Sequence, residues 1–296
     1  MRRIVVLMTC YNRRQKTLAC LAALYRNLLP AGTKLDVVLV DDGSADGTAV
    51  AVGAAYPGVE IVSGDGSLFW NGGMRLAWTV AQTRSYDYLM WLNDDTLLDD
   101  DTIERLLATE AQLRKRLGRA TIIVGSTRIP GNEIPSYGGT VRRDWFRPMH
   151  FELIQPGPEP VACDTMNGNC VLVPREISLA LGNLEPRFVH AMGDIDYGLR
   201  AKACGYSVWV MPGYAGTCVN NDLLTGSFKD VTLPLPVRMR KILSPKALPL
   251  RSWLVLTRRH AGMLWPLHWA WPYCRVVVTS LKYSILNLFA RRRERA

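Results

Sequence analysis

The sequence predicts an α/β fold built on a mainly parallel central sheet that is flanked by helices. Short apolar runs alternate with stretches of helical spacing, the apolar runs are continuous, and polar residues follow them directly. Continuous apolar strands are typical of a parallel sheet that is covered on both faces. Ligands of such sheets bind beyond the carboxyl ends of the strands, where acidic residues of this sequence fall.

The first 125 residues supply most of the predicted elements. Apolar runs predict strands at residues 4–8, 37–40, 59–62, 88–92 and 121–124. Helical spacing predicts helices over residues 18–28, after the second strand, from about Gly73, and around residues 103–107.

The pattern loosens between residues 130 and 160, where six prolines predict loops and an antiparallel excursion. Order returns with an apolar run at residues 170–173, a helix after Gly193 and a strand at residues 207–211. Two regions follow from this layout: residues 1–236, in the halves 1–125 and 126–236, and a distinct tail over residues 237–296.

The composition is that of a folded globular protein, with 48% hydrophobic and 21% charged residues in 296. We predict no secretory signal, because the first nine residues run into a strand and lack a cleavage site. The seven cysteines form no Cys-x-x-Cys pair, which indicates reduced, mostly buried thiols and not a disulfide framework or a zinc site. We therefore expect a cytoplasmic protein.

The net charge of +10 is concentrated at the C-terminal end. Of the 36 basic and 26 acidic residues, thirteen basic residues and one acidic residue fall from Arg238 onward, which leaves a net charge of −2 before it. Aromatic residues interleave with these cations. Prolines and charges interrupt every apolar run before it reaches the roughly 18 residues that a membrane span needs. Such residues on short helices suit the headgroup layer of an anionic membrane. We expect a peripheral protein on the inner face of the cell membrane.

Two acidic turns follow predicted strands: Asp41 and Asp42 after one, and Asp94 and Asp95, preceded by Asn93, after another. Neighbouring carboxylates repel each other unless a donor or a cation compensates them, and Mg²⁺ or Mn²⁺ with substrate phosphates is the usual compensation. An alternative is a plain turn in which Ser44 caps a helix. For the first turn, the residues alone leave both interpretations open.

A third polar cluster begins the predicted helix after Gly193. Asp194 and Asp196 lie at its amino end, where the helix dipole favours negative charge, and Asp196 and Arg200 are spaced to pair on one face. A capped helix with a surface ion pair explains the same residues.

Taken together, these clusters resemble family 2 glycosyltransferases, inverting enzymes of GT-A fold, and particularly the rhamnosyltransferase-like members of surface polysaccharide pathways. The resemblance covers residues 4–212. It rests on five motifs in order: 9–13 (Thr-Cys-Tyr-Asn-Arg), 40–48 (Val-Asp-Asp-Gly-Ser-Ala-Asp-Gly-Thr), 71–77 (Asn-Gly-Gly-Met-Arg-Leu-Ala), 93–95 (Asn-Asp-Asp) and 193–200 (Gly-Asp-Ile-Asp-Tyr-Gly-Leu-Arg). Two positions depart from the family pattern, because Asn93 and Gly193 stand where the family has Asp and Glu.

The resemblance implies a role for each matching residue. Asp194 would be the catalytic base, and Asp95 would bind a Mg²⁺ or Mn²⁺ ion that bridges the donor phosphates. His260 is a candidate third metal ligand, although a lone histidine is more often structural. The residues expected to bind the donor are Thr9, Tyr11, Asn12, Asp41, Asp42, Asn71, Gly73, Asn93 and Asp94.

On the acceptor side, Asp196 and Arg200 would orient the helix that carries the base, and Trp70 could stack on a sugar ring or belong to the core. The full acceptor-side set is Trp70, Asn167, Gly168, His190, Asp196 and Arg200.

The predicted function is transfer of a sugar from a dTDP- or UDP-sugar, with dTDP-rhamnose leading, to a lipid-linked oligosaccharide in O-antigen- or capsule-like synthesis. Residues 1–236 would form the GT-A catalytic domain, with a nucleotide-binding half and an acceptor-side half. Three alternatives are an inactive homologue, a sugar-nucleotide pyrophosphorylase and a nucleic-acid-binding protein. The acidic strand ends would repel a phosphate backbone, so we expect no nucleic-acid partner. Residues 9–14 lack the glycines of a triphosphate loop, which argues against the pyrophosphorylase.

Overall fold

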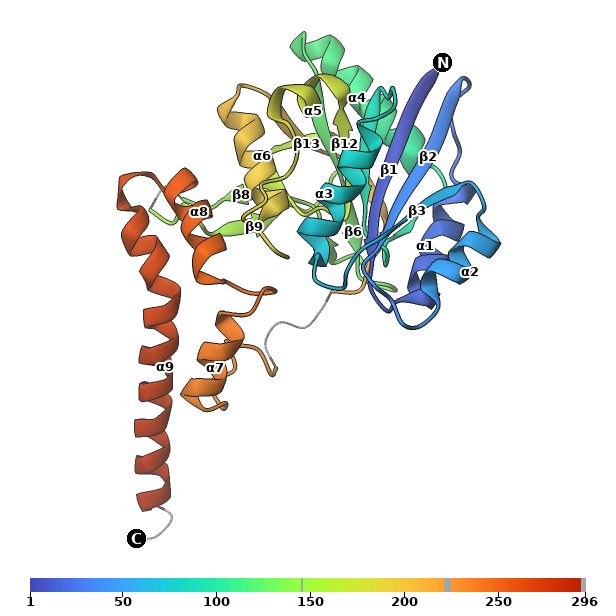
Figure 1. Ribbon diagram of the computed structural model, residues 1–296. Coiled ribbons are helices and arrows are strands. Elements are labelled where there is room, and N and C mark those ends of the chain that lie inside the picture. Colours follow the sequence, from blue (N-terminus) through green and yellow to red (C-terminus); the bar gives the residue numbers. More distant parts are fainter. Residues whose placement is uncertain (145, 221–224, 294–296) are drawn as a thin grey trace. The chain divides into compact units, whose positions relative to one another are not determined.

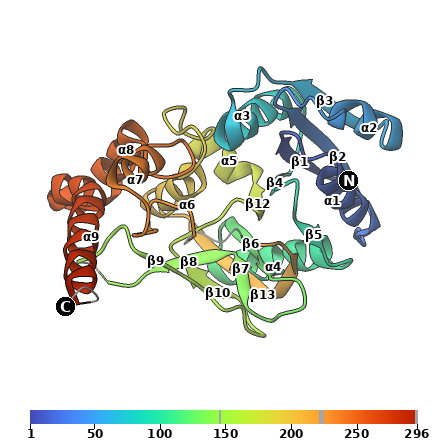
Figure 2. The same ribbon diagram turned by 90° about the horizontal axis from the view of Figure 1, so that it is seen from below.

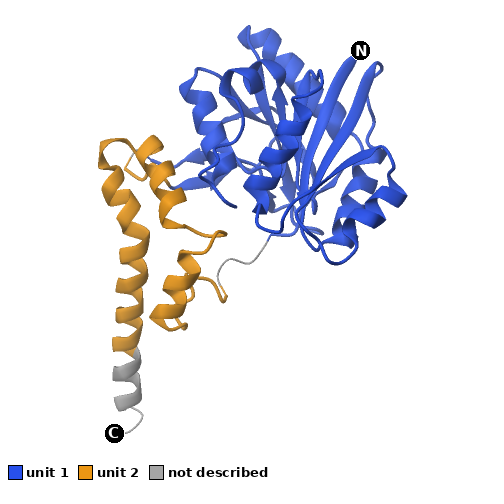
Figure 3. Ribbon diagram, in the orientation of Figure 1, with its two compact units in different colours: residues 1–145, 150–220 blue, residues 146–149, 221–296 orange. Residues whose placement is uncertain are grey.

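The computed structural model describes residues 1–144, 146–220 and 225–293 (Figure 1). The chain divides into two compact units, residues 1–145 with 150–220, and residues 146–149 with 221–296 (Figure 3). The division predicted after residue 236 falls inside a helix of the second unit, and the division predicted after residue 125 falls inside a strand of the first.

The first unit is built on a large sheet with the strand order β10-β13-β6-β12-β4-β1-β2-β3, with β5 beside β13 and β7 beside β6. Strands β11, β8 and β9 form a second, antiparallel sheet, which is the excursion that the prolines predicted. The strands are β1 (Arg2–Cys10), β2 (Thr33–Asp41), β3 (Val59–Ser63), β4 (Tyr88–Leu92), β5 (Leu97–Leu98), β6 (Thr121–Arg128), β7 (Pro135–Tyr137), β8 (Gly139–Arg142), β9 (Phe151–Leu153), β10 (Val161–Cys163), β11 (Thr165–Met166), β12 (Cys170–Pro174) and β13 (Ser207–Thr217).

The centre of the large sheet is parallel: β1 pairs in parallel with β2 and β4, β2 with β3, and β6 with β13. Strand β12 lies between β4 and β6 and is antiparallel to both. Its apolar run predicted a strand without predicting this reversed direction.

Helices cover both faces of this sheet (Figure 2). One buried cluster joins side chains of α3, α5 and α6 to alternate residues of β1, such as Val5 and Leu7. The other joins side chains of α1, α2 and α4 to the intervening residues of β1, such as Ile4 and Val6, which point to the opposite face. These helices are α1 (Arg14–Arg26), α2 (Thr48–Ala55), α3 (Phe69–Ala81), α4 (Thr102–Leu117), α5 (Arg175–Leu181) and α6 (Gly193–Ala203). The mixed α/β fold with a mainly parallel sheet is confirmed.

The second unit is helical, with α7 (Leu235–Ile242), α8 (Leu250–His260), the short 3-10 helix η1 (Gly262–Leu264) and α9 (Trp265–Arg293). Arg238 is buried and donates to the carbonyl oxygen of Phe228 and to the hydroxyls of Thr279 and Ser280, which ties α7 to α9. The expectation of short helices was wrong for α9, which has 29 residues and continues through Pro272. Within the described part of the chain, no helix is long and apolar enough to cross a membrane.

Five of the seven cysteines are buried, as the sequence predicted, while Cys204 and Cys274 are exposed.

Candidate active site

The acidic turns meet at one edge of the large sheet. Asp41 ends β2 opposite Cys10, the last residue of β1, and the turn 93–95 follows β4, which pairs with β1 on its other side. The amide NH of Asn93 donates to the carbonyl oxygen of Asn169, just before β12, at 3.1 Å. Parallel strands thus bring these turns to their common carboxyl edge, where ligands of open α/β sheets bind.

Trp70 connects the turn after β4 to the start of α6. Its indole NH donates to Oδ1 of Asn93 at 2.7 Å. The ring also lies against Gly168, where a β-carbon would stand 2.3 Å from the indole Cζ2 atom. The amide NH of Gly168 in turn donates to Oδ2 of Asp194 at 2.9 Å. Contacts therefore link the predicted metal motif to the predicted base.

Asp194 lies in the first turn of α6, and its carboxylate is fixed by backbone donors. Its Oδ1 atom accepts a hydrogen bond from the amide NH of Ile195 at 2.8 Å, in addition to the bond from Gly168. Burial raises the pKa of the Asp194 carboxyl above its usual value, and the two NH donors offset only part of that rise. The residue as a whole keeps a partly exposed surface.

Asp94 and Asp95 share one guanidinium nitrogen. Nη1 of Arg13 donates to Oδ1 of Asp94 at 2.9 Å and to Oδ2 of Asp95 at 2.7 Å. Burial raises the pKa of Asp94 to about 6, although Arg13 opposes the rise. No role was predicted for Arg13, although it stands in the first of the five motifs.

The acidic pair fits a hard divalent cation whose coordination would be completed by substrate phosphates. Oδ2 of Asp94 is buried and accepts no hydrogen bond among the described residues, which leaves one oxygen free to bind a cation. No group of three or more His, Cys, Asp or Glu residues in the described ranges could hold a metal ion by itself. Mg²⁺ is usually held by one or two carboxylates with phosphates, and the pair matches that donor set.

On the donor side, Gly73 lets α3 approach the end of β1, because a β-carbon there would lie 2.1 Å from Oγ1 of Thr9. Asn12 joins two loops: its amide NH donates to Oγ of Ser44, and its Oδ1 accepts from the NH of Ala45 at 2.7 Å. Tyr11 is 54% exposed beside them. The roles of these residues in donor binding stay predictions.

Asp42 braces the start of α3. Its buried carboxylate accepts hydrogen bonds from the amide NH groups of Gly66, Leu68 and Phe69, so it caps the helix. Asp41, in contrast, accepts only from the NH of Ser44 among the side-chain hydrogen bonds of the described residues. The bracing role of Asp42 was not predicted, and it explains why α3 begins at Phe69 and not near Gly73.

Asn71 is fully buried and holds the loop before α6. Its Nδ2 atom donates to the carbonyl oxygens of Glu185 at 3.0 Å and Phe188 at 2.8 Å. A β-carbon at Gly193 would stand 1.9 Å from Oδ1 of Asn71. Close packing against Asn71 therefore accounts for the glycine at the place where the resemblance expects glutamate.

We expect Gly193→Ala to destabilise the protein by about 1–3 kcal/mol, the usual result of overpacking a close contact. Asn71 cannot turn aside without losing its two carbonyl partners. The control is Gly53→Ala in α2, where the nearest atom to a β-carbon is 3.7 Å away, and where alanine should stabilise the helix by roughly 0.5–1 kcal/mol. Urea unfolding of both variants measures the difference, and equal stabilities would contradict the packing argument.

On the acceptor side, the predicted pairing of Asp196 with Arg200 is present at 2.8 Å. Arg200 also donates to the carbonyl oxygens of Leu181 and Asn183, so the pair fixes α6 to the end of α5. The NH of Asn167 donates to the carbonyl oxygen of Gly138.

The two candidate histidines lie in different units. His190 packs edge-on against Phe69, with ring centroids 6.2 Å apart, and so lies next to the start of α3. His260 ends α8 in the second unit. Their roles at the acceptor and the metal stay predictions.

Three residues of the described chain other than glycine have a positive φ angle: Asn12, Phe69 and Met192. Asn12 and Met192 lie just before α1 and α6, and Phe69 is the first residue of α3. Left-handed backbone costs of order 1–3 kcal/mol at such residues and tends to collect at functional sites. The position of all three supports this edge as the active site.

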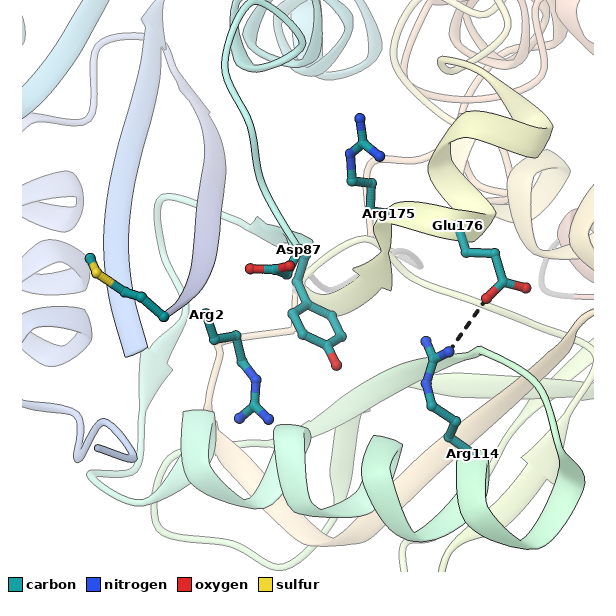
Figure 4. Close-up of a pocket in the computed structure, with 7 residues that line it drawn as sticks. Arg2, Asp87, Arg114, Arg175 and Glu176 are labelled. Carbon is teal, nitrogen blue, oxygen red and sulfur yellow. Dashed lines mark hydrogen bonds and ion pairs between the residues drawn. The ribbon is translucent and has the colours of Figure 1, made fainter. Parts of the chain in front are cut away.

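A pocket of about 410 Å³ lies at the opposite, amino end of β1 and β4 (Figure 4). Its lining includes Arg2, Asp87, Arg114, Arg175 and Glu176, and Arg114 pairs with Glu176 at 3.4 Å. None of the predicted site residues lines it.

The match to a known protein family covers four of the five motifs. The model of a family described as "Glycosyl transferase family 2" matches residues 5–169, more than half of the chain. The chain belongs to this family. The glycosyltransferase is also 26% identical, over 200 residues, to the N-acetylglucosaminyl-diphospho-decaprenol L-rhamnosyltransferase of two Mycobacterium tuberculosis strains, CDC 1551 / Oshkosh and H37Rv. That match covers 60% of this chain and 64% of those relatives, just under two thirds of their length.

Solved structures support the GT-A fold of the glycosyltransferase. The mannosyltransferase PcManGT from Pyrobaculum calidifontis, in complex with GDP-Man and Mn²⁺, has a TM-score of 0.52 and 17% identity, over 99% of this chain and 80% of its own. Residues 1–349 of S. aureus TarS in complex with UDP have a TM-score of 0.53 and 12% identity, over 87% of this chain and 70% of theirs. At these identities, the likeness concerns the fold alone.

Proposed function

We propose that this glycosyltransferase inverts the anomeric centre as it moves one sugar from a nucleoside-diphosphate donor to a hydroxyl of a lipid-linked glycan during surface polysaccharide synthesis. The observation that carries the proposal is the hydrogen bond from Gly168 to Asp194, because Gly168 lies under Trp70, which bonds to Asn93. A single set of contacts thus links the carboxylate of Asp194, the proposed base, to the acidic turn at the carboxyl edge of the sheet.

Asp194 accepts the proton of the acceptor hydroxyl as that oxygen attacks the anomeric carbon from the face opposite the leaving diphosphate. The NH groups of Gly168 and Ile195 fix the direction of the carboxylate. A raised pKa suits this role, since a general base works best when its pKa approaches the operating pH. Asp196 and Arg200 position the helix and take no part in the proton transfer.

Asp95, with Asp94 beside it, would hold Mg²⁺ or Mn²⁺. When bound, the cation would neutralise the negative charge that develops on the leaving diphosphate. The Mn²⁺ named with PcManGT supports this assignment.

For the donor, we propose dTDP-rhamnose first and a UDP-sugar second. The rhamnosyltransferase name of the mycobacterial relatives supports rhamnose. The UDP named with TarS fits a pyrimidine nucleotide, whereas the GDP-Man named with PcManGT fits a purine nucleotide. Thr9, Tyr11 and Asp41 would hold the base and ribose, while Asn93 would lie nearer the sugar; Asn71 is fully buried and would support the site from below the surface. The decaprenol in the relatives' name supports a lipid-linked acceptor.

The test is a thermal-shift panel of nucleotide-sugars with and without Mn²⁺, followed by transfer assays on a lipid-linked acceptor. We expect dTDP-rhamnose to raise the melting temperature most, and Mn²⁺ to increase that shift. A protein that binds a donor but transfers no sugar to any acceptor would be an inactive homologue.

We also propose that the second unit, with the predicted tail 237–296, binds the anionic inner face of the cell membrane. An exposed apolar stripe runs along α9, on residues that recur at spacings of three, four and seven and that are 52–65% exposed: Leu267, Trp271, Val278, Leu281 and Ile285. Arg275 and Lys282 are exposed on the same helix. An apolar stripe bordered by cations complements an anionic lipid surface.

We expect the triple change Leu267→Ser, Trp271→Ser and Val278→Ser to lower binding to vesicles containing phosphatidylglycerol at least tenfold, because each residue gives up apolar contact with the bilayer. All three side chains are exposed, so folding of the unit does not depend on them. The control is Val50→Ser, a 79% exposed residue of α2 in the first unit. Unchanged co-sedimentation of the triple variant would remove α9 as the membrane-binding surface.

A further inference from the structure

Arg13 places a positive charge against the acidic pair that follows β4. One nitrogen, Nη1, donates to Oδ1 of Asp94 at 2.9 Å and to Oδ2 of Asp95 at 2.7 Å. The guanidinium therefore binds the same two carboxylates that would hold a divalent cation.

The pair is too poorly hydrated to stand without a counter-ion. The side chain of Asp94 is 7% exposed and that of Asp95 is 16% exposed. Two adjacent carboxylates in such surroundings repel each other unless cations or donors compensate them. Arg13 supplies one positive charge for two negative charges, and Oδ2 of Asp94 is still left without a hydrogen bond among the described residues. The arginine therefore compensates only part of the negative charge of the pair, which a doubly charged ion would balance.

A divalent cation and the guanidinium compete for this pair. Mg²⁺ binds oxygen ligands at about 2.0–2.1 Å in near-ideal geometry. Among the described residues nothing occupies Oδ2 of Asp94, which is free for the metal, but Oδ1 of Asp94 and Oδ2 of Asp95 are engaged by Nη1. The two cations would also repel each other strongly at this separation in a poorly hydrated site. The bonds of Arg13 must therefore weaken or break for the metal to bind.

The geometry of Arg13 allows that movement. Its carbonyl oxygen accepts hydrogen bonds from the NH of Thr17 at 2.9 Å and from the Thr17 hydroxyl at 3.1 Å, so the backbone is anchored at the start of α1. Its side chain is 38% exposed, so the guanidinium can turn away without opening the core.

We propose that Arg13 is a built-in competitor of the divalent cation, which holds Asp94 and Asp95 until metal and donor arrive together. This inference rests on the proposed function. The diphosphate of the donor offers the guanidinium a new, bidentate partner, which an arginine binds well. Donor binding thereby frees the acidic pair for the metal. The protein alone binds the metal weakly, and nucleotide and metal bind with positive coupling.

The test measures Mn²⁺ binding to the full chain without nucleotide, by the electron paramagnetic resonance signal of free Mn²⁺. We expect Arg13→Gln to bind Mn²⁺ at least about fivefold more tightly than the wild type, the lower end of usual coupling between sites. Arg13→Lys, which keeps the charge, should lie between them. Equal or weaker binding by Arg13→Gln would overturn the proposal.

Lys16→Gln is the matched control, because the Lys16 ammonium attracts Asp94 only through space. If Arg13→Gln raises the affinity for Mn²⁺ no more than Lys16→Gln does, the loss of one positive charge explains the effect, and the proposal is overturned. Melting temperature provides a second readout: Mn²⁺ should raise that of Arg13→Gln more than that of the wild type, whether or not the substitution destabilises the fold.

Repeating the titration with dTDP or UDP separates this proposal from the proposed function. Nucleotide should tighten Mn²⁺ binding more in the wild type than in Arg13→Gln, where no guanidinium remains to be displaced. If the wild type binds nucleotide without any effect of Mn²⁺, and the Arg13 variant loses that binding, Arg13 is itself the permanent cation of the site and the competition is refuted. Failure of the wild type to bind any nucleotide would instead contradict the proposed function.

Discussion

Replacing Asp194 by asparagine is expected to lower sugar transfer by about 10²–10⁴-fold, the range that general-base catalysis contributes. The amide is nearly the same size and keeps one oxygen for a backbone NH of Gly168 or Ile195, but it cannot take a proton from the acceptor hydroxyl. Initial rates with saturating donor and acceptor measure the loss. Because Asp194 would not touch the nucleotide, the thermal shift produced by the donor should remain close to that of the wild type.

The pH dependence of the wild type gives an independent check on the same residue. Only the ionised carboxylate accepts a proton, so kcat/KM falls as the pH falls through the pKa of Asp194. Burial raises that pKa, which places the acid limb above the usual range of an aspartate. In Asp194→Asn, the slope of log kcat/KM against pH below this limb should fall by one. A variant with wild-type rates, or with the full slope, would remove Asp194 as the base.

The sequence predicted the strands well where local composition decides the structure. Strand β4 has the bounds Tyr88–Leu92 that its apolar run indicated, because polar residues stop the run on both sides. The start of α3 could not be predicted in this way. It depends on the carboxylate of Asp42, which reaches the NH of Phe69 from another loop. Likewise, the apolar run of β12 fits a buried strand of either direction, and only its neighbours β4 and β6 show that it is antiparallel.

Within the site, the sequence located the acidic strand ends and the start of α6, but it could not indicate what each side chain contacts. Asn71 and Asp42 were predicted to bind the donor, and the structure shows both engaged with backbone groups of neighbouring loops. The contact of Arg13 with Asp94 and Asp95 spans more than 80 positions of the chain. No local pattern encodes such a contact, although the place of Arg13 in the first motif was a signal that it belongs to the site.

The second large effect is expected at Asp95. Asp95→Ala should lower transfer about 10²–10³-fold, equivalent to roughly 3–4 kcal/mol of transition-state stabilisation, because the charge on the leaving diphosphate is no longer neutralised by a held cation. The residual activity should no longer respond to Mg²⁺ or Mn²⁺. Fold stability should change little, since Asp94 keeps its bond to Arg13 at 2.9 Å.

Asp100→Ala is the matched control for Asp95→Ala. It removes a carboxylate from the same segment, but from a surface pair with Arg26 in which both side chains are at least 60% exposed. Such pairs contribute little, so transfer and metal response should equal those of the wild type. The decisive measurement is transfer across a Mn²⁺ titration for all three proteins, with excess chelator as the zero point. A wild type that is fully active in chelator would show that Arg13, and not a metal, compensates this acidic pair throughout the reaction.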